Sequence, residues 1–130
     1  MATHRVLIVD DERNIRLTLK GALEAIGLEV EAVFQGEEAL QKLAENSYDA
    51  MILDLRLPGM DGLEAIRRIR AHEDKRISEI PIIAVTALAM IGDHEICLAA
   101  GANDYMSKPV QLNNLVNRIK KNLSQNGGSK

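Results

Sequence analysis

The chain contains four short apolar runs, and each one ends in a polar side chain that can do chemistry. The runs and the residues that follow them are Val6–Val9 before Asp10 and Asp11, Met51–Leu53 before Asp54, Ile82–Val85 before Thr86, and Tyr105–Ser107 before Lys108. Short apolar runs with helical patterns between them predict buried parallel strands. Because the carboxyl ends of parallel strands meet at one edge of a sheet, we expect three carboxylates, a hydroxyl and an amine to lie together there.

Strand-like runs alternate with helical patterns five times along the chain. This alternation is typical of βαβ units and of a parallel sheet covered on both faces. Val30–Phe34 is the weakest strand pattern and predicts an edge strand, and the polar stretch His72–Glu79 predicts the longest loop. The length of 130 residues indicates one domain. We expect this domain to span residues 1–124, followed by a flexible tail at residues 125–130 that contains consecutive glycines.

Composition excludes several classes of function. The net charge is -3 and aromatic residues make up only 2% of the chain, so direct contact with nucleic acid is not expected. No apolar run approaches the roughly 18 residues that would span a bilayer, and no signal peptide opens the chain, so we expect a cytoplasmic protein without membrane contact. The only cysteine, Cys97, rules out an intramolecular disulfide bond.

The side chains at the four strand ends suit phosphoryl transfer. A carboxylate that attacks phosphorus approaches a negative group, so the site needs cations to offset the repulsion. Asp10 and Asp11 offer oxygen ligands for Mg²⁺, Lys108 adds a fixed positive charge, and Thr86 can donate its hydroxyl. Each side chain also has a structural alternative: an aspartate can cap a helix, Asp54 can accept from a loop amide, Thr86 can end a strand, and Lys108 can be solvated.

The motifs around these residues resemble the receiver domain of bacterial response regulators, the CheY-like family, from about Arg5 to Leu123. The segments that carry the resemblance are Leu7–Glu12, Leu53–Gly62, Val85–Ala87 and Ala100–Pro109. The resemblance implies an α/β fold of the flavodoxin-like kind, a doubly wound five-stranded parallel sheet of order 2-1-3-4-5 with five helices. It also implies a phosphoacceptor module of a two-component system or phosphorelay.

By the same resemblance, Asp54 accepts a phosphoryl group from the phosphohistidine of a histidine kinase or phosphotransfer protein. Mg²⁺ would be held by Asp10, Asp11, Asp54 and the backbone carbonyl of Arg56. Thr86 and Lys108 would contact the phosphoryl oxygens.

The resemblance further assigns Thr86 and Tyr105 to a conformational switch and implies a cis bond between Lys108 and Pro109. The switch would alter the surface of the fourth helix, the fifth strand and the last helix. That surface would bind an output partner that the sequence does not identify, or a second copy of the chain on phosphorylation. Arg56 and Leu88 flank the path of attacking water in this family, and such side chains predict slow autodephosphorylation.

Three other functions fit parts of the sequence. The first is a receiver-like interaction domain that works without phosphorylation. The second is a phosphohydrolase with an aspartate nucleophile. Such enzymes carry an Asp-x-Asp motif, whereas Asp54 is followed by Leu55 and Arg56. The third is a flavin-binding module, in which the acidic run Asp10–Glu12 would repel the phosphate. We therefore expect no enzyme activity beyond the chain's own phosphorylation and dephosphorylation.

Overall fold

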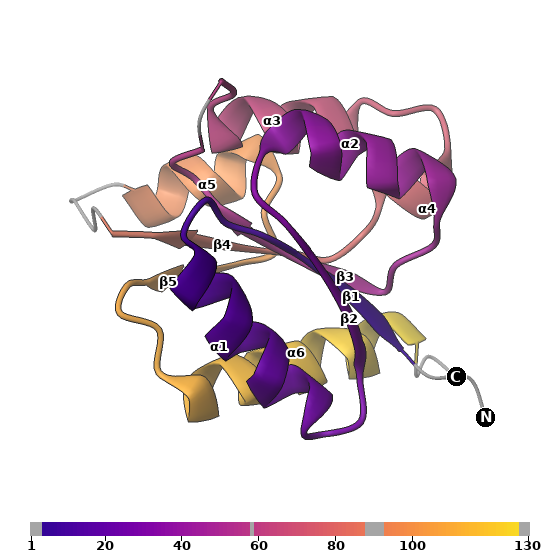
Figure 1. Cartoon of the computed structure of the whole chain (residues 1–130). Coiled ribbons are helices and arrows are strands. Elements are labelled where there is room, and N and C mark those ends of the chain that lie inside the picture. Colours follow the sequence, from indigo (N-terminus) through magenta and orange to yellow (C-terminus); the bar gives the residue numbers. More distant parts are fainter. Residues whose placement is uncertain (1–3, 58, 88–92, 128–130) are drawn as a thin grey trace.

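The computed structural model describes residues 4–57, 59–87 and 93–127 of the chain. Strands and helices alternate along it, with one additional short helix (Figure 1). The elements in chain order are β1 (Arg5–Val9), α1 (Arg13–Glu24), β2 (Glu29–Val33), α2 (Gly36–Glu45), β3 (Ala50–Asp54), α3 (Gly62–Arg70), α4 (Lys75–Ser78), β4 (Ile82–Thr86), α5 (Asp93–Ala100), β5 (Asp104–Ser107) and α6 (Leu112–Gly127).

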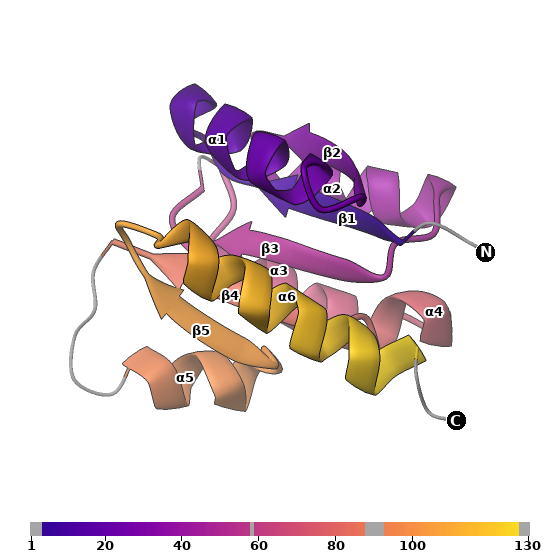
Figure 2. The same cartoon turned by 90° about the horizontal axis from the view of Figure 1, so that it is seen from below.

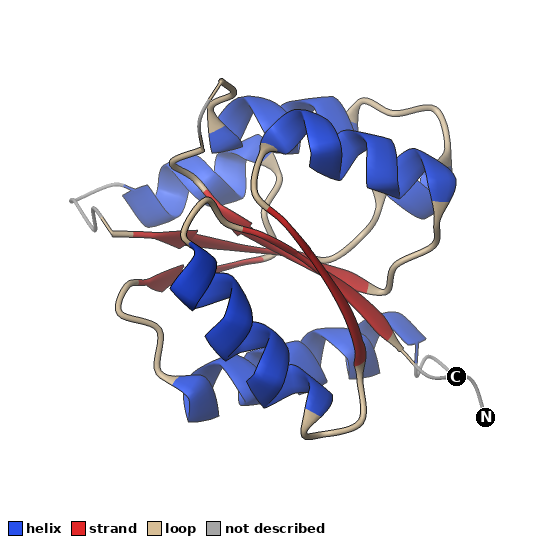
Figure 3. Cartoon of the chain, in the orientation of Figure 1, coloured by secondary structure: helices blue, strands red, loops and turns tan. Residues whose placement is uncertain are grey.

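The strands form one parallel sheet of order β2-β1-β3-β4-β5, which confirms the predicted topology. The helices α2, α3, α4 and α5 cover one face of this sheet, and α1 and α6 cover the other (Figures 1 and 3). β2 lies at the edge, as its weak apolar pattern predicts. All strands run in the same direction, so their carboxyl ends meet at one edge (Figure 2).

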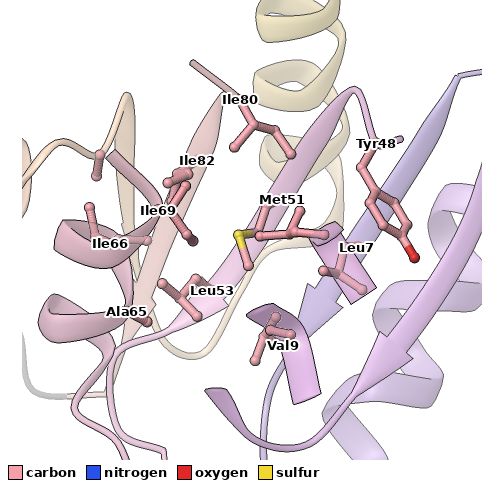
Figure 4. Packing of buried hydrophobic residues seen from close by; sticks show 14 of the residues in the cluster. Leu7, Val9, Tyr48, Met51, Leu53, Ala65, Ile66, Ile69, Ile80 and Ile82 are labelled. Carbon is pink, nitrogen blue, oxygen red and sulfur yellow. The ribbon is translucent and has the colours of Figure 1, made fainter. Parts of the chain in front are cut away.

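Side chains along β1 alternate between two buried clusters, one on each face of the sheet. Leu7 and Val9 point toward α2 and α3 (Figure 4), whereas Val6 and Ile8 point toward α1 and α6. All four side chains are 0% exposed. A central strand of a sheet covered on both faces needs apolar residues at consecutive positions, and this requirement explains the continuous apolar run in the sequence.

The stretch His72–Glu79 differs from its prediction as a loop. It contains the single helical turn α4, so the described part of the chain has six helices rather than five. The Asp74 side chain caps this turn by accepting a hydrogen bond from the Arg76 backbone N–H at 2.9 Å. Ile77 is 3% exposed and packs into the cluster beneath α2 and α3. The cap and this tertiary contact stabilise a turn that the polar composition does not reveal.

The last helix continues beyond the expected end of the domain at residue 124. α6 extends to Gly127. A second glycine follows it in the sequence, and because glycine is a poor helix former, the sequence predicts an earlier end of this helix. Residues 128–130 of the predicted tail lie outside the described residues. Among the described helices, none combines the length and apolar character needed to cross a bilayer.

Candidate functional site

The four predicted strand ends converge at the carboxyl edge of the sheet. Asp10 follows β1, Asp54 ends β3, Thr86 ends β4, and Lys108 follows β5. The backbone N–H of Lys108 donates to the Thr86 carbonyl at 2.8 Å, which holds the end of β5 beside the end of β4. Each of these side chains therefore starts from a backbone position that the sheet itself defines.

Lys108 lies between the two buried aspartates. Its Nζ is 3.1 Å from Asp10 Oδ2 and 3.1 Å from Asp54 Oδ2. The Lys108 side chain is 12% exposed, and the side chains of Asp10 and Asp54 are 4% and 3% exposed. The lysine is thus ion-paired at the site rather than solvated.

The other oxygen of each aspartate accepts a backbone hydrogen bond. Asp54 Oδ1 accepts from the Arg56 N–H at 3.0 Å, and Asp10 Oδ1 accepts from the Glu12 N–H at 2.9 Å. Asp54 therefore accepts from a loop amide, the structural role considered for it, in addition to its ion pair, whereas the partner of Asp10 is the residue before α1 and not the first turn of that helix. These hydrogen bonds also fix the orientation of both carboxyl groups before any ligand arrives.

The residues fit a small divalent cation that prefers oxygen ligands. Asp10, Asp11 and Asp54 each offer one carboxylate oxygen, and these oxygens all lie within 4.8 Å of one another. Asp11 is exposed, so a cation at this cluster would keep some of its water, as Mg²⁺ usually does in proteins. The backbone of Arg56 pairs with Asp61 and lines the same pocket, which has a volume of about 930 Å³.

Burial and charge shift the pKa values of the central pair. Burial, together with the nearby Asp10 charge, raises the pKa of Asp54 above its ordinary value of 3.8, although its hydrogen bonds to Arg56 and Lys108 oppose this change. For Lys108, burial lowers the pKa, but hydrogen bonds and attraction to Asp10 and Asp54 outweigh it, so the net shift is upward. Lys108 is thus a permanent cation next to an aspartate whose ionised form is disfavoured.

Replacing Asp54 with asparagine is expected to stabilise the metal-free protein at neutral pH, because the raised pKa of Asp54 means that its ionised form is disfavoured in the folded state. A raised pKa means that the folded state binds more protons than the unfolded state just above pH 3.8, so stability falls as the pH rises through that window. The gain in Asp54→Asn should therefore grow from near zero in acid to its full value at neutral pH.

Urea unfolding across this pH range measures the effect. Asp61→Asn is the control, because Asp61 caps α3 through Leu63 and asparagine caps equally well. Equal stability of Asp54→Asn and the parent protein at neutral pH would contradict the conclusion that the ionised form of Asp54 is disfavoured in the folded protein.

The loop between β3 and α3 forms one wall of the site. Gly62 starts α3, and its N–H donates to the Leu55 carbonyl at 3.0 Å. A Cβ atom at Gly62 would lie 2.4 Å from Leu55 Cα and 2.9 Å from the Asp54 carbonyl oxygen. Only glycine allows this approach, which closes the loop directly behind Asp54.

Thr86 and Tyr105 lie on neighbouring strands and face the same side of the sheet. The register pairs Ala84 with Tyr105, and alternation along β4 puts Thr86 on the same face as Ala84. Thr86 is 4% exposed, and the partly buried Tyr105 ring stacks on His94 of α5 with ring centroids 5.4 Å apart. The bond between Lys108 and Pro109 is cis, as predicted.

The two residues expected to flank the path of water have different outcomes. Arg56 is exposed and lines the pocket beside Asp54. Leu88 lies outside the described residues.

Two residues contact the site that the sequence did not single out. Glu12 Oε1 lies 3.2 Å from Lys108 Nζ, and Arg16 Nη1 donates to the Asp10 carbonyl at 2.9 Å. Glu12 directly follows the two aspartates, which is the one signal in the sequence that marks it as a candidate. Nothing in the sequence distinguishes Arg16 from the other charged residues on predicted helices.

Comparison with known proteins identifies the class to which the fold and the site correspond. The family model of the response regulator receiver domain matches residues 6–120. The chain therefore belongs to the response regulator receiver family of two-component systems.

Individual relatives agree with this assignment. The chain is 41% identical over 127 residues to the uncharacterized transcriptional regulatory protein YkoG of Bacillus subtilis (strain 168), covering 98% of this chain and 54% of that protein. It is 39% identical to the response regulator MprA of Mycobacterium sp. (strain KMS), covering 89% of this chain and 49% of that protein. The chain thus spans about half the length of these curated relatives.

Among solved structures, a putative response regulator from Chloroflexus aurantiacus J-10-fl is similar, with a TM-score of 0.87 and 39% identity. The similarity covers 95% of this chain and 99% of that one.

Proposed function

We propose that this chain is a phosphoacceptor switch in which Asp54 receives a phosphoryl group from the phosphohistidine of a histidine kinase or phosphotransfer protein. The observation that carries the proposal is the cluster of Asp10, Asp11 and Asp54 at the carboxyl edge of the sheet, two of which pair with the largely buried Lys108 ammonium. Such a cluster combines a nucleophile, ligands for a cation and a fixed positive charge.

In the proposed step, an Asp54 carboxylate oxygen forms a bond to phosphorus as the bond between phosphorus and the donor's imidazole nitrogen breaks. The electron pair of the broken bond leaves with the imidazole. Lys108 and the Thr86 hydroxyl donate hydrogen bonds to the transferred oxygens, and these contacts offset the charge that arrives beside Asp10 and Asp11.

Asp10, Asp11, Asp54 and the Arg56 carbonyl would hold Mg²⁺ in this mechanism. The ion supplies positive charge to the phosphoryl oxygens when bound. The same carboxylates repel one another without it, so we expect added Mg²⁺ to raise the melting temperature of the parent protein. Asp11→Asn should reduce that rise, and an unchanged rise in the variant would contradict this ligand set.

Phosphorylation of the purified chain by acetyl phosphate with Mg²⁺ tests the proposal directly. Intact-mass spectrometry should show one added phosphoryl group in the parent protein and none in Asp54→Asn. The control is Asp49→Asn, because Asp49 lies just before β3, at the opposite end of that strand from Asp54, and should label fully. Full labelling of Asp54→Asn would refute the assignment of the acceptor. A parent protein that takes no label would instead support an interaction domain that ignores phosphate.

The two residues assigned to the path of attacking water bear on the lifetime of the phosphorylated form. Arg56, which lines the pocket, and Leu88 would shield the phosphorus from water, and we expect the phosphorylated form to persist well beyond seconds. Loss of the label within seconds after donor removal would contradict this expectation. We expect no turnover of small phosphate esters. A phosphohydrolase would have an acid two residues after its aspartate nucleophile, and this chain has Arg56 at that position.

Thr86 and Tyr105 would carry the signal from the site to the surface. The two residues share one face of the sheet on adjacent strands, and Tyr105 stacks on His94. If the Tyr105 ring turns inward on activation, the stack is broken and the ring-proton shifts of His94 should change on addition of a beryllofluoride mimic with Mg²⁺. Unchanged His94 shifts in an activated protein would contradict the switch.

The surface of α5, β5 and α6 would bind an output partner or a second copy of the chain. Ile96 and Leu98 of α5 are 49% and 42% exposed, which leaves apolar area for such a contact. Light scattering with and without the beryllofluoride mimic distinguishes the two occupants, since only a homodimer raises the mass of the isolated chain.

A further inference from the structure

Lys108 contacts three carboxylates, one more than the buried pair. Glu12 Oε1 lies 3.2 Å from Lys108 Nζ, on the side that opens to solvent: the Glu12 side chain is 62% exposed, whereas that of Lys108 is 12% exposed. Asp10, Asp54 and Glu12 therefore all contact the ammonium, and Glu12 is the most exposed of the three.

The local geometry favours this contact over the usual role of the position. Glu12 stands at the residue before α1, where side chains commonly accept hydrogen bonds from the first turn, but it makes no such cap. Its backbone N–H instead donates to Asp10 Oδ1 at 2.9 Å, which fixes the start of the side chain at the edge of the site. The carboxylate reaches a lysine 96 positions away in the sequence.

The charge at the pocket explains what this contact does. Asp11, Glu12, Asp54 and Lys108 all line the pocket, and Asp10 lies behind them. Asp61 and Arg56 line the same pocket, so five acids and two cations lie at the site, and a phosphoryl donor brings further negative charge. Of these acids, Asp10, Asp11 and Asp54 form the cation cluster, and Glu12 lies outside it.

We propose that Glu12 is a positioning residue that holds the Lys108 ammonium in the resting state and selects against highly charged phosphoryl donors. This inference rests on the proposed phosphorylation of Asp54. Removing the Glu12 charge removes one of the three carboxylates that compete with the transferred oxygens for Lys108, and it lowers the repulsion that a donor meets at the open side of the pocket. Phosphorylation should therefore become faster, and most so for the donor with the larger negative charge.

Two small donors of different charge test the proposal. With acetyl phosphate, which carries two negative charges at neutral pH, Asp54 gains the phosphoryl group as the bond to the acetate oxygen breaks and the electron pair leaves with acetate. Phosphoramidate, which carries a smaller net charge, transfers the same group as its phosphorus–nitrogen bond breaks and the electron pair leaves with ammonia. At saturating Mg²⁺, Glu12→Gln should raise the rate with acetyl phosphate about fivefold and the rate with phosphoramidate less. Added salt should shrink the difference.

Matched variants separate charge from structure. Glu29 has the same side-chain exposure of 62% and pairs with Arg5 at the start of β1, away from the site, so Glu29→Gln should leave both rates unchanged. Glu12→Asp keeps the charge and should retain most of the discrimination between donors. A Glu12→Gln variant with equal acceleration for both donors, or with none, would overturn the proposal.

Chemical modification of lysine tests the resting-state contact without phosphorylation. Under limiting acetic anhydride, peptide mapping should show Lys108 acetylated at least about twofold faster in Glu12→Gln than in the parent, because the outermost of its three partners is gone. Lys20, which pairs with Glu24 on α1, is the internal control. Unchanged Lys108 modification would refute the holding role even if phosphorylation is not observed. If modification increases but the parent chain takes no phosphoryl group, the proposed function fails and the contact stands.

Discussion

Replacing Lys108 with methionine is expected to lower the free energy of unfolding by about 3 kcal/mol at neutral pH. Methionine keeps the length of the side chain but removes the ammonium that lies 3.1 Å from both Asp10 and Asp54. Those two side chains are only 4% and 3% exposed, so water compensates for little of the lost charge. Removing one member of a buried ion pair leaves the remaining charges uncompensated, which is the costly case for such pairs.

The same variant should respond more strongly to Mg²⁺ than the parent protein does. A cation at the carboxylates of Asp10, Asp11 and Asp54 would restore part of the lost positive charge, so urea unfolding should show a larger stabilisation by Mg²⁺ in Lys108→Met. The exposed Lys120 on α6 provides the control, and Lys120→Met should change stability little. If Lys108→Met unfolds at the same urea concentration as the parent, the ion pairs contribute no net stability.

Replacing Gly62 with alanine is expected to destabilise the fold by about 3 kcal/mol and to impair the site at the same time. The new methyl group would lie 2.4 Å from Leu55 Cα and 2.9 Å from the Asp54 carbonyl oxygen. Both neighbours are backbone atoms, so no side-chain rotation relieves the clash. The segment just after Asp54 must move, and with it the Arg56 amide that orients the Asp54 carboxylate.

Thermal unfolding and Mg²⁺ titration measure the two effects of Gly62→Ala. Gly21→Ala is the matched control, because Gly21 lies within α1 with no atom within 4 Å of its added Cβ. That change should raise stability by about 0.5 to 1 kcal/mol, since alanine is the better helix former. A Gly62→Ala variant that keeps its melting temperature and its Mg²⁺ affinity would show that the loop can relax.

Much of the fold follows from residue patterns that act locally. The apolar run Val6–Val9 predicts a strand buried on both faces, and the structure confirms it. Asp61 is placed to cap the next helix, and its carboxylate accepts from the Leu63 N–H at 3.0 Å. These features depend on neighbours within a few residues, and short-range periodicity and capping rules therefore find them. The strand order came instead from the resemblance to a family.

Other features depend on contacts between distant parts of the chain. α4 forms where Ile77 packs into the core, although its surroundings in the sequence are polar. The stacking of Tyr105 on His94 joins β5 to α5 through a contact that no pattern along the chain encodes. Both require knowledge of how separate elements pack, which periodicity does not supply.

For this protein, the sequence by itself determined which side chains arrive at the carboxyl edge of the sheet. Asp10, Asp54, Thr86 and Lys108 directly follow or end strands, and parallel strands have only one edge at which those ends meet. Only the tertiary structure decided how the charges are shared there. It brings the Glu12 carboxylate to the Lys108 ammonium, although 96 positions separate the two residues in the sequence. This contact depends on side-chain conformations and on the places of β1 and β5 in the sheet, and local sequence patterns give neither.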